Sequence, residues 1–584
     1  MPNDVRTDTV PEDCLVPAAA RPSYLPLPGV DVPTELNLCA EMVDAHVRAG
    51  RGSSPAILFR EDDRTVTFDE LLAAVRRTAG ALVAAGLRPG DRVGVRSGNR
   101  PEATIAILAV WRAGGVVVPV PPQARAAEIP FYVDDTRARF LMVENAGDAM
   151  AEVRKAAEAG TLAGLEAVIA MPDAAAPPDG PDTVVTLPDR TRTPFLALAE
   201  LAEAGQPLDD PRPVSAESLA LIWHTGGTTG TPKACYHQAG PFLAGGHAAG
   251  QAFGFTPDEV QLAFPGPVGH AAGLIGRTIV SLLHGVPYVE VANFADAEAV
   301  LDAISRYRVT WANAIAVTWA RMLRIYEADT GRYDVSALTG AYAPMLSVVS
   351  ADVHAGWKRH GVLLHNTMGS TQFATWFLTS PRDVETAPGS VGRPSPGYEA
   401  TVIASGTSDW LELPPDEVGL LALRGPTGLT YWNRPAELQA RDVRHGWTVM
   451  DDLAKKDADG NFWYLGRSDF LINTAGFKVA PVEVEEVLGT HPAVAEVAVV
   501  GSPDPERGEV VTAWVVLEDG VTPDDDLARA LQEYVKAAIS PYKYPRRLVF
   551  TSALPRDLVS KVQVRELKER ARQIDFGDRR FVVA

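Results

Sequence analysis

The chain has 584 residues, of which 46% are hydrophobic and 22% are charged, and its formal net charge is −20. This length exceeds a single ordinary hydrophobic core, the composition excludes a disordered or fibrous chain, and the negative charge argues against non-specific nucleic-acid binding. The three cysteines, Cys14, Cys39 and Cys235, form no CxxC pair, so neither a disulfide framework nor a cysteine zinc site is expected.

The N-terminal segment predicts a cytoplasmic protein. MPNDVRTDTVPEDC is polar and acidic where a signal peptide requires a basic stretch followed by an apolar one. No run of about 18 uninterrupted apolar residues occurs, so no membrane span is expected. We expect a monomer or homodimer that binds neither membranes nor nucleic acids.

The first third of the chain alternates helix and strand patterns. Thr67 and Glu70 have capping-box spacing, and apolar residues then recur at the helical period until Gly86. RVGVRS, from Arg92, predicts a strand; 102–112 predicts a second helix, and the apolar run VVVPV follows it. Strand, helix and strand at this spacing indicate parallel βαβ units.

The rest of the chain divides into further blocks. Residues 174–189 are rich in Pro, Ala and Asp, which predicts an exposed excursion before a new block near Pro213. From 391 to about 424, short strands with Gly and Pro breaks predict a small barrel or sheet. After GRSDF (466–470), a helix, two strands and another helix predict a compact α+β unit.

The most informative motif is HTGGTTGTPK (224–233), which follows the strand-like stretch SLALIW. Glycines let backbone N–H groups approach an anion closely, and threonine hydroxyls add donors around phosphate oxygens. No Gly-Lys-Ser/Thr follows the required gap, so the motif is not a Walker A loop. From the residues alone, a flexible surface loop is the competing interpretation.

This segment resembles the phosphate-gripping loop of the adenylate-forming superfamily, which includes acyl-CoA synthetases, luciferases and peptide-synthetase adenylation domains. The loop of that superfamily reads Thr-Ser-Gly-Thr-Thr-Gly-x-Pro-Lys, and Gly226 here replaces the serine. The resemblance implies that the loop holds ATP phosphates and that Thr228 faces Mg²⁺. The nucleotide-binding residues implied here are Thr225, Gly226, Gly227, Thr228, Thr229, Gly230 and Lys233.

Other motifs of the superfamily follow in the same order over most of the chain. NTMGSTQ (366–372) resembles the adenine-binding turn, and GWTVMDDLAKKDADG (446–460) resembles the segment that supplies a ribose-binding aspartate. The arginine of GRSDF is implied to face the nucleotide. The nucleotide-binding residues implied by these motifs are Asn366, Met368, Gly369, Ser370, Thr371, Gln372, Asp452 and Arg467.

The C-terminal motifs imply a coenzyme A site and a catalytic lysine. GRSDFLINTAGFKVAPVEVEEVL (466–488) resembles the hinge, at Asp469, and the loop that lines the pantetheine tunnel. LPRDLVSKVQVREL places Lys561 at the catalytic lysine of the superfamily. The CoA-binding residues implied are Gly476, Phe477 and Lys478.

The resemblance implies an α/β fold in two parts. Residues 1–468 would form a large N-terminal domain of two βαβ-type subdomains plus a small β-barrel-like subdomain, which binds the nucleotide and the acyl group. Residues 469–584 would form a small mobile α+β domain that carries Lys561 and the CoA-tunnel loop, and that swings about Asp469 between two half-reactions.

The chemistry explains why such residues are needed. A carboxylate is a poor electrophile and must first become a mixed anhydride with AMP, and its attack on the α-phosphate brings like charges together. The cation of Lys561 would relieve that repulsion, and the glycine-rich loop would hold the leaving pyrophosphate. The CoA sulfur then attacks the acyl carbonyl. The implied cofactors are ATP, CoA and Mg²⁺.

The acid itself is predicted from the segment PGPVGHAAGL (265–274), which resembles the lining of the acyl pocket. The implied lining residues are His270, which would also be catalytic, Ala271, Gly273 and Gly246. Small side chains leave volume, which favours a bulky hydrophobic or aryl acid, and the C-terminal motifs look most like those of aryl and medium-chain acyl-CoA ligases. Tight helix packing is the alternative explanation for the small residues.

Five departures from the superfamily pattern cluster around ATP. Gln372 replaces the usual metal-binding glutamate, Gly226 removes a hydroxyl, and Asp451 adds a carboxylate beside the ribose aspartate. Tyr342 stands where a glycine is expected beside adenine, and Ser560 replaces a glycine before the catalytic lysine. One hypothesis is that adenylation is weakened or lost, Mg²⁺ included, and that a separate enzyme supplies the acyl-adenylate.

Two alternatives stay open. The first is a conventional two-step acyl-CoA synthetase whose metal is held by phosphates and water. The second, from another class, is a non-catalytic protein that binds acyl-AMP or acyl-CoA. Retention of Lys561, Asp452 and Gly476 argues against the second.

Overall fold

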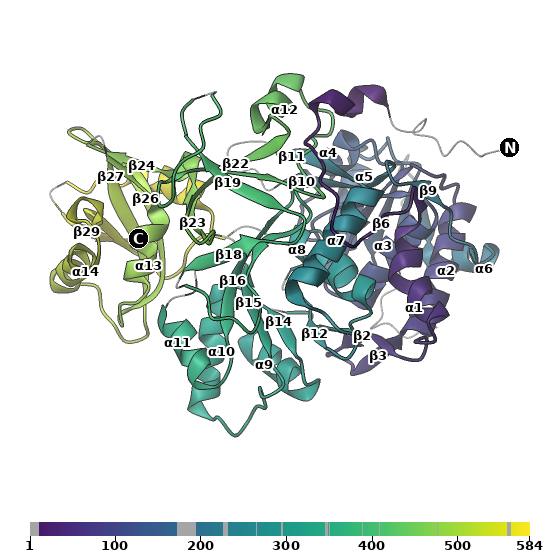
Figure 1. Cartoon of the computed structure of the whole chain (residues 1–584), viewed down its shortest axis with the longest axis horizontal. Coiled ribbons are helices and arrows are strands. Elements are labelled where there is room, and N and C mark those ends of the chain that lie inside the picture. The colour runs from purple at the N-terminus through teal and green to yellow at the C-terminus, as the bar shows by residue number, and fades with distance from the viewer. Residues whose placement is uncertain are drawn as a thin grey trace.

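The computed structural model shows an α/β chain built on two large sheets and a smaller C-terminal sheet (Figure 1). It describes residues 11–145, 147–171, 194–225, 232–263, 266–293, 296–344, 349, 351–387, 389–407, 409–475, 477–556, 562–577 and 579–584. The predicted excursion at 174–189 lies outside these residues. None of the described helices has the length and apolar character needed to cross a membrane.

The first sheet has seven strands in the order β11-β10-β5-β4-β6-β7-β8. Its strands are parallel except for the antiparallel pair β10–β11, which places β11 at the edge. The strands are β4 (Arg92–Arg96), β5 (Val116–Pro119), β6 (Phe140–Glu144), β7 (Ala167–Met171), β8 (Phe195–Ala197), β10 (Leu219–Thr225) and β11 (Lys233–Gln238). The helices around this sheet are α2 (Phe68–Ala84), α3 (Pro101–Arg112), α4 (Ile129–Asp135), α5 (Gly147–Glu158) and α6 (Leu198–Ala204).

Helix α2 begins at the predicted capping box. The Thr67 hydroxyl accepts from the Glu70 backbone N–H at 3.3 Å, and Glu70 Oε2 accepts from the Thr67 backbone N–H at 2.8 Å. The apolar face of α2, which includes Leu71 and Val75, is fully buried. The predicted second helix and the strand from Arg92 are also confirmed, as α3 and β4.

The second sheet begins as a parallel sheet and continues as an antiparallel one. Its order is β19-β20-β22-β23-β18-β17-β16-β15-β14-β12-β13-β2-β3, with β21 paired to β22. The parallel strands are β2 (Pro55–Phe59), β12 (Gln261–Leu262), β13 (Tyr288–Glu290), β14 (Trp311–Asn313), β15 (Gly340–Pro344) and β16 (Leu364–Ser370), and β3 (Arg64–Thr67) is an antiparallel edge. The antiparallel strands are β17 (Thr375–Thr379), β18 (Ser390–Pro394), β19 (Glu399–Ile403), β20 (Gly419–Arg424), β21 (Val443–Arg444), β22 (Trp447–Lys456) and β23 (Phe462–Arg467).

The short strands predicted for the barrel-like part are therefore hydrogen-bonded to the second parallel sheet. β16 pairs with β17 at Met368 and Leu378, and Leu378 pairs in turn with Pro394 of β18. The long hydrophobic core extends between the two large sheets around α7 (Ala239–Phe253) and α8 (Ala271–Ile275). The helices beside the second sheet are α9 (Ala297–Arg306), α10 (Ala316–Ala328) and α11 (Ala351–Arg359).

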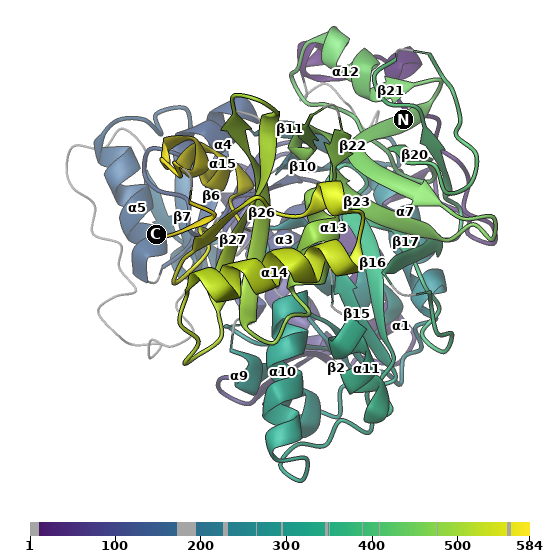
Figure 2. The same ribbon diagram turned by 90° about the vertical axis from the view of Figure 1, so that its left-hand side faces the viewer.

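The C-terminal part has its own sheet and core, as the α+β prediction required. The order is β25-β24-β27-β28-β29, with β26 paired to β27. The strands are β24 (Ile472–Thr474), β25 (Phe477–Val479), β26 (Val494–Asp504), β27 (Gly508–Leu517), β28 (Arg547–Phe550) and β29 (Phe581–Val583), and the helices are α13 (Pro481–Leu488), α14 (Asp525–Ala538) and α15 (Val564–Gln573). Figure 1 shows this unit beside β23, with α13 next to that strand, and Figure 2 shows it facing the viewer.

Ion pairs join the C-terminal unit to the larger one. Arg321 Nη2 of α10 lies 3.5 Å from Glu496 Oε1 of β26, and Arg324 Nη1 lies 3.2 Å from Glu518 Oε1. Helix α13 also packs on β23. The two parts are thus in direct contact through charged side chains and one helix face.

The N-terminal segment runs across the surface of the larger unit. Tyr24 forms a parallel bridge with Gly425, and the Ser23 backbone N–H donates to the Gly446 carbonyl at 2.8 Å. Further along, β1 (Glu35–Leu36) pairs with β9 (Val214–Ser215). The segment therefore connects the start of the chain to its middle.

Candidate active site

The motif residues gather where parallel strands of both large sheets end. β10 of the first sheet ends at Thr225, and β16 of the second sheet ends at Ser370. In open α/β sheets, ligands bind in the crevice outside the carboxyl ends of the strands. Two motifs far apart in the sequence thus supply adjacent walls of one candidate site.

The described ends of the glycine- and threonine-rich motif belong to the paired strands β10 and β11. Thr225 and Lys233 pair across the two strands, and the Thr225 hydroxyl donates to the Lys233 carbonyl at 3.1 Å. The residues between them are predicted to bind phosphate, and Gly226, Gly227, Thr228, Thr229 and Gly230 lie outside the described residues. The structure therefore fixes the two ends from which the loop projects.

Two side chains of β11 join this hairpin to the predicted adenine turn. His237 Nε2 lies 2.9 Å from the Thr371 carbonyl, and the Cys235 thiol donates to the same oxygen at 3.6 Å. Burial lowers the pKa of His237 to about 4, so the ring is neutral at physiological pH and its Nε2–H donates. Sequence analysis missed both residues, although they alternate on the strand that follows the glycine-rich motif.

The adenine turn has a buried base and an accessible tip. Asn366 and Met368 are only 2% and 5% exposed, and Asn366 Nδ2 donates to the Ser390 carbonyl at 3.4 Å. A Cβ at Gly369 would lie 2.6 Å from the Thr375 carbonyl oxygen, so only glycine fits there. The accessible or half-exposed residues of the tip are Gly369, Ser370, Thr371 and Gln372.

Tyr342, which stands where a glycine is expected beside adenine, does not have its side chain at this tip. Its side chain is fully buried in β15, and its hydroxyl donates to the Ser380 carbonyl at 2.9 Å. Its ring contacts Phe253, Trp311 and His365, with centroids 4.9, 5.5 and 5.3 Å away. Tyr342 therefore belongs to the aromatic core between α7 and the second sheet.

The predicted ribose aspartate and the predicted nucleotide arginine face each other across two strands. Asp452 of β22 pairs with Arg467 of β23, and it is 8% exposed. Burial raises the pKa of Tyr464, and a hydrogen bond to the Asp452 carboxylate adds to the effect. The hydrogen bond to Tyr464 thereby holds the Asp452 carboxyl in position.

Arg467 links this strand pair to the predicted hinge. Its Nε donates to Asp469 Oδ1 at 3.0 Å, and its Nη2 lies 3.2 Å from Asp451 Oδ2. Asp451 points to the exposed side of β22, away from the buried side of Asp452. The additional carboxylate at 451 is therefore paired with an arginine.

A buried ion pair holds the segment that contains His270. Arg277 donates to Glu290 through Nε at 2.6 Å and through Nη2 at 2.5 Å, and both side chains are almost completely buried. Its remaining nitrogen, Nη1, donates to the carbonyls of Gly266 and Gly273, at 2.9 and 2.6 Å. His270, the half-exposed residue before α8, is thus fixed between two carbonyls bonded to one arginine.

Close packing accounts for two of the small residues assigned to the acyl pocket. A Cβ at Gly246 would lie 2.8 Å from Ile279 Cβ and from Leu283 Cδ2, and a Cβ at Gly273 would lie 2.3 Å from the Pro267 carbonyl. Ala271 is 8% exposed beside His270. The packing alternative therefore explains the glycines, and the alanine remains a candidate for the pocket wall.

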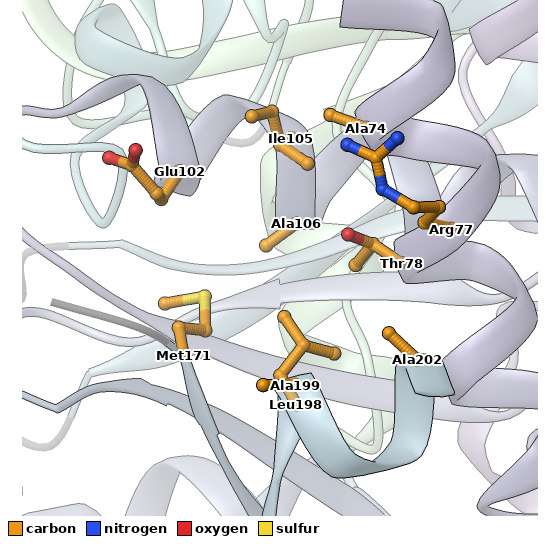
Figure 3. A pocket seen from close by; sticks show the side chains of 10 residues that line it. All are labelled: Ala74, Arg77, Thr78, Glu102, Ile105, Ala106, Met171, Leu198, Ala199 and Ala202. Atoms are coloured by element: carbon orange, nitrogen blue, oxygen red, sulfur yellow. The ribbon is translucent and has the colours of Figure 1, made fainter. Parts of the chain in front are cut away.

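A separate apolar cavity of about 210 Å³ lies between α2, α3 and α6. Figure 3 shows its lining, which includes Ile105, Met171 and Leu198, with Arg77 and Glu102 among the polar groups. No motif residue lines it. It is therefore distinct from the candidate active site.

The described residues do not form a metal site of their own. They contain no cluster of three or more His, Cys, Asp or Glu side chains that could hold a metal ion. Mg²⁺ is usually bound by one or two carboxylates together with substrate phosphates, and Gln372 offers only a neutral amide oxygen. The protein donors seen here thus do not fit a resident magnesium ion.

Three further predicted residues lie outside the described residues: Gly476, Ser560 and Lys561. On either side of position 476 in the sequence, Thr474 of β24 pairs with Phe477 of β25. The backbone of Phe477 and Lys478 forms β25. The segment with Lys561 is bracketed by an antiparallel bridge between Arg556 and Val562.

Comparisons with known proteins agree with this arrangement. Residues 44–432 match the AMP-binding enzyme family, and residues 483–561 match the AMP-binding enzyme C-terminal domain. The mitochondrial acyl-coenzyme A synthetase ACSM5 of Homo sapiens is 31% identical over 525 residues, which cover 86% of this chain and 83% of that protein. The sulfoacetate–CoA ligase of Cupriavidus necator is 29% identical, covering 87% of this chain and 93% of that protein.

Solved structures show the same fold over nearly the whole chain. The anthranilate CoA ligase AuaEII, in complex with anthranoyl-AMP, superimposes with a TM-score of 0.81 at 24% identity, covering 93% of this chain and 98% of that one. ATP-bound MatB from Rhodopseudomonas palustris superimposes with a TM-score of 0.77 at 25% identity, covering 93% and 99%. The expected fold class is confirmed.

Proposed function

This chain belongs to the AMP-binding enzyme family, and we propose that it joins a bulky hydrophobic or aryl carboxylic acid to coenzyme A through an acyl-AMP intermediate. It is an acid–thiol ligase, as its relatives are. The main support for the proposal is the hydrogen bonding that connects the phosphate motif to the adenine turn. His237 and Cys235, on the strand that follows the phosphate motif, both hydrogen-bond the carbonyl of Thr371 in the adenine turn.

The proposed reaction has two balanced steps. A carboxylate oxygen of the acid attacks the α-phosphorus of ATP, and pyrophosphate leaves with the electrons of the broken P–O bond. The sulfur of CoA then attacks the acyl carbon, the bond from that carbon to the bridging oxygen breaks, AMP leaves with that oxygen, and the thiol proton passes to solvent. Asp452 would accept from the ribose hydroxyls, and Lys561 would offset the negative charge of the first step.

The described contacts favour retention of the first step. Tyr342 is buried away from the turn, and Asp451, the added carboxylate beside the ribose aspartate, is paired with Arg467. Gln372 remains, half-exposed in the turn, with a neutral amide in place of a carboxylate. We therefore propose a two-step ligase whose adenylation step is slowed at Gln372 and whose metal arrives bound to ATP.

Gln372 also favours a second candidate function, in which the chain transfers acyl groups from a ready-made acyl-AMP to CoA. Such an enzyme would rely on a separate adenylating enzyme. The lost charge is worth at most about 4 kcal/mol at about 4 Å and an effective dielectric of about 20, enough to make the first step very slow.

The class of acid rests on fewer residues. Ala271 and Ala272 follow His270 and have short side chains, which leaves room for a bulky group. The glycines at 246 and 273 do not contribute to this argument, because their neighbours occupy the space.

Formation of the CoA thioester by mass spectrometry tests the proposal. Aryl, polycyclic and short-chain acids are each offered once with Mg·ATP and once as synthetic acyl-AMP. Product by both routes, with bulky acids preferred, is the expected result. Product from acyl-AMP alone would identify the transferase, and product by neither route would refute a ligase.

A further inference from the structure

Three polar side chains meet at the base of the β10–β11 hairpin. Asp135 is the last residue of α4, and His224 is the residue before Thr225. His224 Nε2 lies 2.9 Å from Asp135 Oδ2. Arg434 binds the same carboxylate in a bidentate manner, with Nη1 2.7 Å from Oδ1 and Nη2 2.8 Å from Oδ2. Trp432 Nε1 donates to the backbone carbonyl of Asp135 at 2.8 Å.

The group is buried, and its charges are well defined. The side chains of His224, Asp135 and Arg434 are 3%, 13% and 15% exposed. Burial lowers the pKa of His224, so the neutral ring donates Nε2–H to Asp135. Burial opposes ionisation of Asp135, but hydrogen bonds from His224 and Arg434 hold the pKa of its carboxyl below the usual value. Asp135 is therefore a carboxylate paired with one guanidinium.

The packing around His224 also restrains its position. Its ring contacts those of Phe131 and Tyr132, with centroids 5.1 and 5.0 Å away. Both aromatic residues belong to α4, the helix that ends at Asp135. One helix thus fixes His224 both by ring contacts and by a hydrogen bond.

Arg434 extends the restraint to the other end of the phosphate motif. Its Nη2 also donates to the Pro232 carbonyl, at 3.3 Å. Residues 224 and 232 lie on opposite sides of the segment 226–231, so one carboxylate is connected to both flanks. β11 is the last strand of the first sheet, and the backbone of residues 430–432 bonds along its outer side: the Trp432 N–H donates to the Ala234 carbonyl and the Tyr236 N–H to the Thr430 carbonyl, both at 2.9 Å. Arg434 therefore reaches the hairpin from a segment that is already bonded to β11.

We propose that Asp135 is a positioning residue for ATP: through His224 and Arg434 it holds both flanks of the phosphate motif in the orientation that binds the polyphosphate. It would act through these two residues and need not touch the substrate. The inference rests on the proposed function, because it assigns the phosphate motif to ATP. A loss of this positioning should slow adenylation but not the transfer to CoA, since only adenylation needs a bound triphosphate.

The test replaces Asp135 by Asn, which keeps the shape of the side chain and removes its charge. The dissociation constant of Mg·ATP is measured by calorimetry, and thioester formation is measured from ATP and from synthetic acyl-AMP. We expect Asp135→Asn to weaken ATP binding and to slow the ATP route by about tenfold or more, because small misplacements of binding groups are costly. The acyl-AMP route should stay within about twofold of the wild type.

Two companion variants separate positioning from general damage. His224→Gln keeps a side-chain N–H for Asp135 and should restore most of the ATP affinity that His224→Phe loses. Asp44→Asn is the matched control, because Asp44 Oδ2 lies 2.9 Å from Arg112 Nη1 in a similarly buried pair elsewhere. Its thermal unfolding midpoint should fall, while the ratio of the two routes stays unchanged.

Equal losses in both routes with Asp135→Asn, or an unchanged affinity for ATP, would overturn the inference. If the wild type makes no thioester by either route, the proposed ligase function fails instead. The effect of Asp135→Asn on ATP affinity then still decides the positioning role.

Discussion

Gln372 lies half-exposed in the turn after β16, directly after the residue whose carbonyl is bonded by His237. The turn is rigid, because Ala374 donates to the Ser370 carbonyl at 2.9 Å and Gly369 has no room for a side chain. A carboxylate placed at 372 would therefore be presented in a fixed position and at little cost in conformational entropy.

We predict that Gln372→Glu speeds the ATP route and lowers the Mg²⁺ concentration needed for half-maximal rate. A change of about tenfold is expected, because a charged ligand replaces a neutral one at a site reached by solvent. Initial rates of pyrophosphate release across a magnesium titration provide the measurement. Gln206→Glu, at an exposed site remote from the turn, is the control and should change neither quantity. A variant indistinguishable from the wild type would remove Gln372 as the cause of weak adenylation.

The identity of the motif residues was predictable from the sequence, but their surroundings were not. Tyr342 occupies a motif position, yet its side chain enters the aromatic core and its hydroxyl bonds Ser380. Asp451 and Asp452 are adjacent on β22 and so point to opposite faces, one toward solvent and one toward Tyr464. Side-chain direction depends on strand register, which no single motif specifies.

At the scale of elements, α7 shows how small residues set the distance between helices. Gly246 faces Ile279 and Leu283 of the segment after α8, and a Cβ at position 246 would lie only 2.8 Å from each of these side chains. Close approach of two helices needs such a residue, because a protein interior has little free volume to absorb an added methyl group.

We predict that Gly246→Ala destabilises the protein by about 1–3 kcal/mol, since the added carbon must displace Ile279 or the helix itself. The midpoint of denaturant unfolding gives the measurement. Gly164→Ala is the matched control, because its nearest contact would be an ordinary 3.7 Å from Asp134 Oδ1. An equally stable Gly246→Ala with an increased KM for the acid would indicate instead that the glycine borders an open pocket.

Sequence patterns predicted the helices and strands whose limits are set by residues close by in the chain. The capping box at Thr67, the helix at Pro101–Arg112 and the α+β unit at the end of the chain are examples. The antiparallel part of the second sheet also depends on a pairing between β18 and β23, in which Ser390 meets Trp463 from far along the chain. The bond from His237 to Thr371 spans the same kind of separation, which periodicity cannot detect.

For the whole molecule, two ion pairs cross the contact between its two parts, beside the packing of α13 on β23. Arg321 and Arg324 lie on the same face of α10, and each meets a glutamate of the C-terminal unit, Glu496 or Glu518. Exposed pairs of this kind contribute little to stability individually and are weakened by salt. They therefore suit a contact that must form and break, as the proposed two half-reactions require.

We predict that the double variant Arg321→Glu, Arg324→Glu releases the C-terminal unit, because four carboxylates would then face one another. The radius of gyration from small-angle scattering should increase at low salt and return toward the wild-type value as salt screens the repulsion. The matched control is Arg332→Glu, Arg359→Glu, which makes the same charge change at pairs within the larger unit. Equal expansion of both variants would assign the effect to net charge rather than to this contact.

The N-terminal segment has a consequence for synthesis on the ribosome. Ser23 and Tyr24 are among the first described residues to be translated, yet their backbone partners are Gly446 and Gly425. More than four hundred residues must therefore be translated before this segment can take its place. The segment around Ser23 and Tyr24 consequently docks late, after the strands of the larger unit that it contacts have been translated.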